Sequence, residues 1–315
     1  MKFCGPAEDP VASVVICAYL SRHRIDRALG ALRNQDVDEP FEVIAVVSGD
    51  DGCESHLASA HPDVRIVSSR LRIFPGRARN LGISAARAPV IAFVPDDGVA
   101  DSGWLRARLC HHRRGVPLVA GGISNGTPMS IVGTAGYYVE YTASMPVLAV
   151  LERQPVPHTL SYAHDVFDTA GMFPEIDVPG EDTLLNQRCV DLGISHVFEP
   201  AAAMGHLNPT RLRPYLSHQA SHGRGLARCV MTGTIADPFE RRRGRRRLAI
   251  SALVAYPLRR WVRTLSLARC GGRGHAIRFV LLTPLILAGY LAGGWGSWRE
   301  FRRCEDELTP TRPVG

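Results

Sequence analysis

Two pairs of neighbouring acidic residues and one histidine supply the clearest chemistry in this sequence. Asp96 and Asp97 follow an apolar run, Glu181 and Asp182 open a helical segment, and His206 lies downstream of both pairs. Adjacent carboxylates repel each other unless a cation, a proton or a substrate relieves the repulsion. This set of groups indicates a divalent metal site beside a general base, which together can transfer a group from a diphosphate.

The scaffold that must position these residues is expected to alternate strands with helices. Strands are predicted at the apolar runs 13–18, 41–47, 64–67 and 90–94, and helices at 25–32, 76–86, 102–114, 181–192 and 212–228. Ser102 is expected to cap the third of these helices. The order predicts an α/β fold with a mostly parallel sheet flanked by helices. Ligands bind at the carboxyl ends of such strands, where Asp50, Asp51, Asp96 and Asp97 fall.

The charge is unevenly distributed along the chain. Residues 231–315 hold 16 arginines against 6 acidic residues, whereas residues 1–230 hold 21 basic and 24 acidic residues. The hydrophobic share of 45% is ordinary for a globular protein. We therefore expect a globular body at 1–234 and a basic, apolar helical region at 235–315, whose deletion from Ile235 leaves a more soluble body.

The eight cysteines are scattered and include no Cys-x-x-Cys pair. This spacing argues against a zinc knuckle and against a secreted disulfide framework, so we expect a reducing, cytoplasmic environment. The apolar run at 11–20 is interpreted as a buried strand, and no signal peptide is expected.

Four sequence blocks occur in an order that is informative as a set. They are Ser13–Tyr19 (SVVICAY), Gly76–Ala86 (GRARNLGISAA), Phe93–Asp97 (FVPDD) and Gly180–Leu184 (GEDTL). Their order and spacing resemble family 2 glycosyltransferases of the GT-A fold, over roughly residues 11–230. The resemblance implies an inverting transferase with a nucleotide-diphospho-sugar donor, Mn²⁺ or Mg²⁺, and a hydroxyl acceptor. It also implies a nucleotide-binding half at about 11–122 and an acceptor half at about 123–234.

The resemblance further implies which residues hold the donor. The turn at Ala18 and Tyr19 is expected to hold the nucleotide. Arg79 and Asn80 are expected near the diphosphate and the base, and Asp96 is expected to face the ribose.

Metal and acceptor roles follow from the same resemblance. Asp97 and His206 are the expected metal ligands. Asp97 is the acid left to carry the cation, because Pro95 stands where the metal-binding motif often begins with Asp. A hard dication offsets the charge that develops on a leaving diphosphate. Asp182 is expected to be the base that takes the acceptor's proton, with Glu181 orienting it or holding the donor sugar.

The end of the second strand departs from the family pattern. An acid is expected just before Gly49, but Ser48 stands there, so Asp50 or Asp51 is expected to make the contact to the base. The identity of the nucleotide stays open for this reason.

Each motif also has a simpler interpretation. The pair beginning at Asp96 suits a turn, and the pair beginning at Glu181 suits the amino end of a helix dipole. His206 suits a structural histidine. Arg79 and its neighbour suit a solvated helix face, although they follow a helix start that would bind an anion. The tyrosines at 137, 138 and 141 are expected to pack rather than bind an acceptor.

Other classes of protein fit less well. A sugar nucleotidyltransferase needs a glycine-rich basic loop after the first strand, and Cys17–Arg22 is not such a loop. A nucleic-acid-binding protein is disfavoured by the acidic body. An inactive GT-A scaffold that acts as a binding partner stays open, because the metal-binding motif is degraded.

The carboxyl-terminal region combines charge with apolar length. Six arginines fall within 241–247, and 279–298 is free of charge for 20 residues but contains Pro284. We expect membrane-surface or re-entrant helices on anionic lipid, at the cytoplasmic face of the membrane. The expected anchors are Trp261, Trp295 and Trp298. The alternative is that these helices pack on the body or on a second copy. If the protein acts at the membrane, we expect the acceptor to be a hydroxyl of a saccharide or of a lipid-linked saccharide. The product would then belong to cell-surface polysaccharide, glycolipid or lipid-linked saccharide synthesis.

Overall fold

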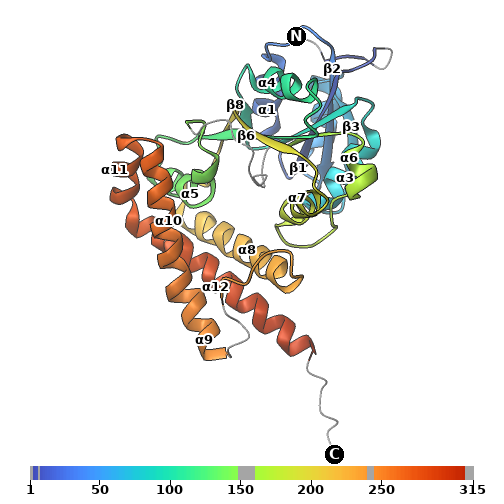
Figure 1. Cartoon of the computed structure of the whole chain (residues 1–315). Coiled ribbons are helices and arrows are strands. Elements are labelled where there is room, and N and C mark those ends of the chain that lie inside the picture. The colour runs from blue at the N-terminus through green and yellow to red at the C-terminus, as the bar shows by residue number, and fades with distance from the viewer. Residues whose placement is uncertain (1–2, 6–7, 148–159, 240–244, 309–315) are drawn as a thin grey trace, which may run out of the picture. The chain divides into compact units, whose positions relative to one another are not determined.

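The computed structural model describes residues 3–5, 8–147, 160–239 and 245–308 (Figure 1). The chain divides into two compact units. Unit 1 comprises Met1–Pro128, Ala143–Asp177 and Glu181–Asn208, and unit 2 comprises Met129–Thr142, Val178–Gly180 and Pro209–Gly315.

Unit 1 is built on a mixed sheet. Within the described residues its eight strands are ordered β3-β2-β1-β4-β7-β6-β8-β5. The strands are β1 (Ala12–Tyr19), β2 (Phe41–Ser48), β3 (Arg65–Ser69), β4 (Val90–Pro95), β5 (Gly98–Ala100), β6 (Leu118–Asn125), β7 (Ser161–Ala163) and β8 (His196–His206). The pairs β3-β2, β2-β1, β1-β4 and β6-β8 are parallel, whereas β4-β7, β7-β6 and β8-β5 are antiparallel. The expected mostly parallel sheet is therefore corrected to a mixed one, because β7 enters between β4 and β6 in the opposite direction.

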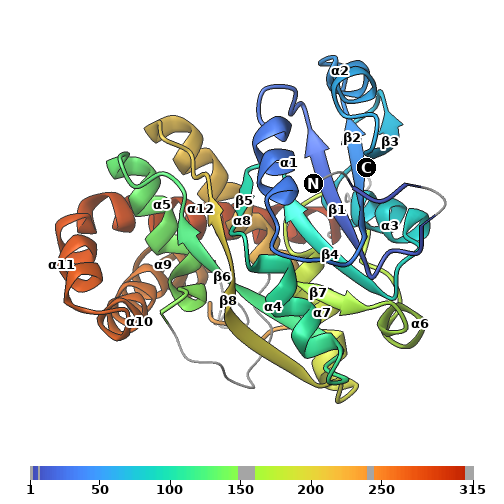
Figure 2. The same ribbon diagram turned by 90° about the horizontal axis from the view of Figure 1, so that it is seen from above.

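Helices cover both faces of this sheet, so its central strands are buried on both sides. The helices of unit 1 are α1 (Ile25–Arg33), α2 (Cys53–Ala60), α3 (Pro75–Ala85), α4 (Trp104–His112), α6 (Val166–Ala170) and α7 (Glu181–Asp191). Alternate residues of β1 face opposite layers, as the two-residue period of a strand requires. Val14 lies in one core cluster with Leu29 of α1, whereas Val15 lies in the other with Ile83 of α3. The two helices flank β1 in Figure 2.

The regular elements described in unit 2 are all helices. They are α5 (Ile131–Tyr141), α8 (Leu212–Met231), α9 (Arg245–Ile250), the π-helix η3 (Ser251–Ala255), α10 (Tyr256–Cys270), α11 (Arg273–Leu281) and α12 (Thr283–Leu308). The short 3₁₀ helix η1 (Thr142–Ser144) follows α5 at the boundary between the two units. The three tyrosines of α5 are buried, as packing residues should be.

Glycines allow α8 and α12 to pack backbone against backbone. A Cβ atom on Gly223 would lie 1.9 Å from the carbonyl oxygen of Gly293, and one on Gly296 would lie 2.0 Å from that of Ala220. Ser297 Oγ donates to the carbonyl of Gly223 at 2.7 Å. Any side chain at these glycines would force the two helices apart.

This packing bears on the expected boundary at residues 234 and 235. The compact units instead divide the chain at Asn208 and Pro209, because α8 packs along α12. The functional domains of 1–234 and 235–315 stay a prediction, since compactness alone does not define a function.

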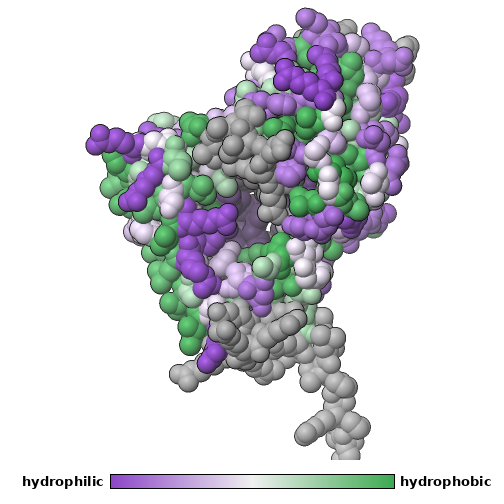
Figure 3. Space-filling model, in the orientation of Figure 1, coloured by the Kyte–Doolittle hydropathy of each residue, from purple (hydrophilic) through white to green (hydrophobic). Residues whose placement is uncertain are grey.

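No single helix among the described residues has the length and apolarity to cross a membrane. One pair, Arg273–Leu281 with Thr283–Cys304, passes both tests together but bends by 71° at its break. Large apolar side chains are exposed on α10 and α11. They include Leu258, Val262, Ile277, Val280 and Leu281. Figure 3 shows a largely green, hydrophobic surface over α10. Most of the arginine run at 241–247 lies outside the described residues.

Local expectations had mixed outcomes. Gly193 follows α7 with φ of +70°, as expected for a glycine that ends a helix. The expected cap at Ser102 is wrong, because α4 is preceded by Gly103 and makes no side-chain cap bond. Ser102 instead accepts the Asp36 N–H through its backbone carbonyl at 2.8 Å.

Candidate active site

Strand pairing brings Asp97 and His206 together at one edge of the sheet. Gly98 of β5 is the register partner of His206 at the end of β8, and Asn125 of β6 is the partner on the other side. The Leu207 N–H donates to the carbonyl of Asp97 at 2.9 Å. The side chains consequently face each other, with Asp97 Oδ1 3.3 Å from His206 Nε2.

The hydrogen bonds of Asn208 decide which nitrogen of His206 faces Asp97. Asn208 Nδ2 donates to the His206 carbonyl at 3.1 Å and to Asn125 Oδ1 at 3.3 Å, so the amide oxygen is the atom turned toward His206 Nδ1, at 3.2 Å. Nδ1–H therefore donates to Asn208. In neutral His206, the Nε2 lone pair and the Asp97 carboxylate then point at the same space, and only a proton or a cation can join two acceptors. These residues fit a divalent cation.

Asp96 points away from this pair toward the loop after β1. Its Oδ2 accepts hydrogen bonds from Ser21 Oγ and from Arg24 Nη2, the latter at 2.7 Å. Burial and the neighbouring charge of Asp97 raise the pKa of Asp96, although Ser21 and Arg24 oppose the shift. Asp96 and Asp97 thus have separate partners.

The second acidic pair opens α7 and meets Arg79 of α3. Arg79 Nη1 donates to Glu181 Oε1, whereas Arg79 Nη2 is 3.9 Å from Asp182 Oδ2. The Thr183 N–H donates to Asp182 Oδ1 at 2.8 Å. Burial and the charge of Glu181 raise the pKa of Asp182 to about 7. A carboxyl group with this pKa can change its protonation state near neutral pH, as a general base requires.

Arg79 is held in place on several sides. Its guanidinium lies over the rings of Phe93 and Phe173, at 5.8 and 5.2 Å from their centroids. Although burial opposes it, the charges of Glu181 and Asp182 raise the pKa of Arg79. The cation is therefore fixed beside the acidic pair.

Asn80 has a different role from its neighbour. Its Nδ2 donates to the carbonyl of Phe173 at 2.9 Å, and its Oδ1 accepts the N–H of Phe173 at 3.0 Å. The amide of Asn80 is thus engaged in positioning the ring that packs on Arg79. Its expected contact to the donor stays a prediction, and this geometry does not favour it.

The ends of β1 and β2 carry the expected nucleotide residues side by side. Tyr19 and Ser48 are register partners, and the Leu20 N–H donates to the Ser48 carbonyl at 3.2 Å. Ala18 is buried, whereas Tyr19 is 39% exposed. Arg72 lies over that ring at 4.7 Å. An exposed aromatic ring at a strand end suits stacking on a flat ligand.

The two acids after β2 are not equivalent. Asp51 Oδ2 accepts the Arg22 N–H at 2.9 Å, and its Oδ1 accepts the Cys53 N–H at 3.2 Å. Asp51 therefore joins two loops, while Asp50 is exposed. Of the two alternatives left open by the sequence, Asp50 is better placed to meet a ligand.

Several supporting residues were missed by sequence reasoning. Ser21 and Arg24 hold Asp96, Asn208 orients His206, and Phe173 packs on Arg79. Leu20 has φ of +50°, an uncommon conformation for a non-glycine residue that often marks a functional turn. Of these residues, only Ser21 and Arg24 could have been found from the sequence, because a serine and an arginine just after a predicted strand are candidate ligand-binding residues.

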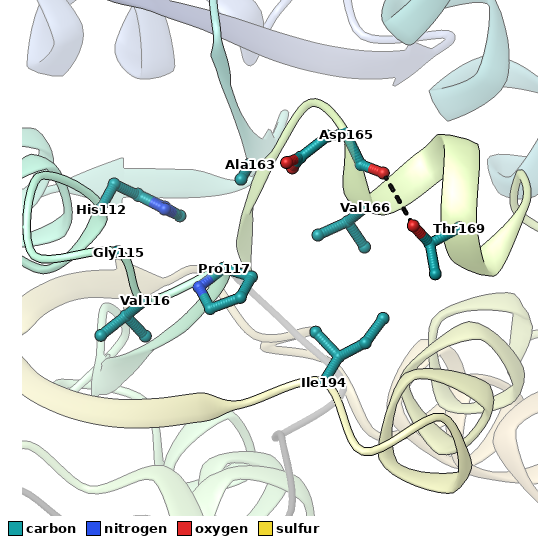
Figure 4. Close-up of a pocket in the computed structure, with 9 residues that line it drawn as sticks. All are labelled: His112, Gly115, Val116, Pro117, Ala163, Asp165, Val166, Thr169 and Ile194. Carbon is teal, nitrogen blue, oxygen red and sulfur yellow. Dashed lines mark hydrogen bonds between the residues drawn. The ribbon is translucent and has the colours of Figure 1, made fainter.

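Unit 1 also contains a pocket of about 300 Å³ that does not include these residues (Figure 4). It is lined in part by His112, Pro117, Asp165 and Ile194. Pro117 and Ile194 precede β6 and β8, so the pocket lies at the amino ends of these strands, whereas Asn125 and His206 end them. It is not part of the candidate active site.

Comparison with known proteins identifies the first part of the chain. Residues 13–130 match the family model for glycosyl transferase family 2. This segment resembles that family. The expected resemblance is thereby confirmed.

Individual glycosyltransferases match over parts of their length. The chain is 29% identical over 201 residues to the pre-mycofactocin glycosyltransferase of Mycobacterium tuberculosis, which covers 58% of this chain and 42% of that protein. It is 33% identical over 115 residues to the uncharacterized glycosyltransferase YfnE of Bacillus subtilis, and the match covers 36% of this chain and 29% of that protein. The chain thus spans less than half the length of these relatives.

Solved structures share the fold at low identity. The mannosyltransferase PcManGT of Pyrobaculum calidifontis, in complex with GDP-Man and Mn²⁺, matches with a TM-score of 0.58 and 18% identity, over 94% of this chain and 89% of that one. TarS residues 1–349 of S. aureus match with a TM-score of 0.52 and 14% identity, over 93% and 91%. These neighbours support the GT-A fold, with the mixed sheet described above.

Proposed function

We propose that this protein transfers a sugar from a nucleotide-diphospho-sugar to a hydroxyl acceptor with inversion at the anomeric carbon. The observation that supports the proposal is that unit 1 contains both Asp97 and His206, whose Oδ1 and Nε2 atoms are 3.3 Å apart, and a buried carboxyl group, Asp182, whose pKa is about 7. The family match of 13–130 supports the same reaction class.

Asp97 and His206 are the proposed ligands of the divalent ion. A carboxylate oxygen and an imidazole nitrogen are both acceptable donors to Mn²⁺, and substrate phosphates complete such sites. When bound, Mn²⁺ or Mg²⁺ would offset the negative charge of the leaving nucleoside diphosphate. The solved mannosyltransferase with GDP-Man and Mn²⁺ supports this choice of cofactor, and the ion preference is a proposal.

Asp182 is the proposed general base. Arg79 donates to Glu181 and lies 3.9 Å from Asp182, and burial and the charge of Glu181 still raise the pKa of Asp182 to about 7. In the ionised form it would take the proton of the acceptor hydroxyl as the oxygen attacks. Glu181, held by Arg79, would orient the neighbouring groups rather than accept the proton. A direct displacement of this kind inverts the anomeric carbon.

The donor side of the site is proposed to follow β1, β2 and β4. The exposed ring of Tyr19, the backbone around Ala18 and Ser48, and the carboxylate of Asp50 would contact the nucleoside. Asp96, fixed by Ser21 and Arg24, would accept hydrogen bonds from the ribose hydroxyls.

The acceptor and the cellular location are proposals from unit 2. Its exposed apolar side chains on α10 and α11 alternate with arginines, including Arg259, Arg263 and Arg278. Such a surface suits the interface of an anionic membrane. We propose that the protein acts at the cytoplasmic membrane face on a saccharide or lipid-linked acceptor, in cell-surface polysaccharide, glycolipid or lipid-linked saccharide synthesis.

A donor panel tests the reaction class. Purified full-length protein is incubated with UDP- and GDP-sugars, with Mn²⁺, Mg²⁺ or EDTA, and nucleoside-diphosphate release and thermal shift are recorded. We expect at least one donor to give metal-dependent release, and an inverted anomeric configuration by NMR of the product. Absence of binding and of release with every donor and metal would contradict the proposal, and a retained configuration would contradict the inverting mechanism.

A further inference from the structure

A second cluster of potential metal ligands lies in unit 2 and has no part in the proposed reaction. Glu140 of α5 and His218 and His222 of α8 each offer one ligand atom, and these atoms lie within 4.8 Å of one another. His218 Nε2 is 3.0 Å from Glu140 Oε1 and 3.3 Å from Oε2. Two helices separated by more than 70 residues in the chain therefore converge on one point.

The spacing of the two histidines places them on one face of α8. Residues four apart in a helix are neighbours on its surface, and a His-x-x-x-His pair on a helix is a known zinc-ligand geometry. The rings of His218 and His222 lie with their centroids 4.5 Å apart, tilted by 51°. All three residues of the cluster are partly shielded from solvent.

The Glu140 carboxylate is oriented by a further residue. Gln219 Nε2 donates a hydrogen bond to Glu140 Oε1. Outer groups that orient the first ligands are a regular part of metal sites. Gln219 thus gives the carboxylate a fixed direction without supplying a ligand itself.

We propose that Glu140, His218 and His222 bind a transition-metal ion of the Zn²⁺ class and clamp α5 to α8. Two imidazoles and one carboxylate form a donor set that Zn²⁺ accepts in tetrahedral geometry, with water in the fourth position. Hard ions such as Mg²⁺ prefer oxygen ligands and would bind this set less well. Metal binding requires deprotonated ligands, so it displaces the proton that His218 Nε2 shares with Glu140.

A superficially similar cluster in unit 1 does not carry the same proposal. His56 Nε2 and His61 Nε2 lie 2.6 and 2.9 Å from Asp26 Oδ1. Arg33 Nη2 donates to His61 Nδ1 at 3.1 Å, so His61 Nε2 carries the proton that Asp26 accepts. This hydrogen-bonded arrangement is already satisfied, and ligation through His61 Nε2 would oppose it.

Co²⁺ and Zn²⁺ titrations of the full-length protein test the site. Tetrahedral Co²⁺ gives intense visible absorption, which octahedral Co²⁺ on oxygen ligands does not. We expect the wild type to develop this absorption with one equivalent of Co²⁺, to lose it when Zn²⁺ is added, and to melt at a higher temperature with Zn²⁺. His222→Gln and Glu140→Gln should each lower the metal affinity more than about 100-fold. Even substitutions of residues that only orient a metal ligand lower the affinity by about 10–100-fold.

Matched substitutions separate this site from the others. His56→Gln changes the unit 1 cluster, and Asp97→Ala changes the proposed donor-metal site; both should leave the absorption intact. Far-UV circular dichroism confirms that each variant is folded. Absorption that survives both His222→Gln and Glu140→Gln, or that disappears in His56→Gln or Asp97→Ala, would overturn the proposal. So would a wild type that binds no Co²⁺ at pH 7.5. None of these readouts depends on transferase activity, so this site and the proposed function can fail separately.

Discussion

Arg79 donates its hydrogen bond to Glu181 and not to Asp182, and this contact makes two neighbouring acids unequal. Glu181 gains a buried cationic partner, whereas for Asp182 the effects of burial and of repulsion from Glu181 outweigh the opposing effects of Arg79 and of the Thr183 N–H. The pKa of Asp182 is raised to about 7 as a result. The structure thus distinguishes a candidate base from a candidate positioning group within a single Glu-Asp pair.

The first prediction concerns the base. Asp182→Asn keeps the shape of the side chain and removes its basicity, so turnover should fall by roughly 10²–10⁴-fold, the usual worth of general base catalysis. Donor affinity should change little, because the loss lies in the transition state. Both quantities are measured with the donor found in the panel, by product formation and by calorimetry. If Asp182→Asn retains near wild-type turnover while Glu181→Gln is inactive, the two roles are reversed.

The second prediction concerns stability and pH. A pKa raised from 3.8 to about 7 means that the folded state holds this proton more tightly than the unfolded state. The corresponding stability is present below about pH 4 and is lost as the pH rises to about 7, at about 1.4 kcal/mol per pKa unit. Asp182→Asn should therefore melt at a higher temperature than the wild type at pH 8, and the difference should shrink toward pH 4.

A matched control accompanies this measurement. Glu181→Gln removes the partner that Arg79 holds most closely, so it should lower the melting temperature at pH 8. A fall in melting temperature for Asp182→Asn at pH 8 would show that its ionised form stabilises the fold, contrary to this account of the pair.

Much of the first half of unit 1 could be predicted from the sequence. The runs at 13–18, 41–47 and 90–94 became β1, β2 and β4 within one or two residues, because buried parallel strands are continuous apolar runs. β6 and β8 were not predicted. Their sequences contain glycine, alanine and proline, and their strand form depends on pairing with distant partners, which local patterns do not reveal.

The candidate site was predictable only in part. The acids at strand and helix ends could be chosen because their positions follow from the order of the elements. The partner of each acid could not, because it depends on contacts across the fold. Arg79 and Glu181 are 102 residues apart, and Ser21 and Asp96 are 75 apart. Asn80 illustrates the limit, since it lies in the motif but holds the backbone of Phe173.

The third prediction concerns the metal. Asp97→Ala should abolish metal-dependent nucleotide binding while the melting temperature without metal stays close to that of the wild type. His206→Gln should weaken the same binding less severely, because the amide oxygen retains one donor to the ion. Calorimetry of UDP and GDP with Mn²⁺ and with EDTA measures both effects. Undiminished binding by Asp97→Ala in Mn²⁺ would rule out this ligand.

The fourth prediction concerns the carboxyl-terminal helices. Charge pattern alone predicts a more soluble protein after deletion from Ile235. The packing of α8 on α12 predicts the reverse, because deletion exposes the face of α8 that contains Gly223 and Ala227, and leaves Arg228 without Glu300. Expression of the truncated chain, followed by size-exclusion chromatography, should show aggregation. A monomeric, cooperatively melting product would show instead that α8 does not need α12.

The last prediction concerns the membrane. If the arginines at 241–247 attract anionic lipid, replacing all six with glutamine should weaken binding to vesicles that contain phosphatidylserine or phosphatidylglycerol. Each basic residue near such a surface contributes about 1 kcal/mol, so the combined loss should be large at low salt and small at 0.5 M salt, where the charges are screened. A control variant loses the same number of exposed arginines from unit 1 and should bind as the wild type does.

Apolar contacts from α10 and α11 should preserve some vesicle binding at high salt. Leu281 is 73% exposed, so Leu281→Ser should weaken the binding that remains at high salt. Equal vesicle binding by the wild type and the six-arginine variant at low salt would exclude this run as the anchor.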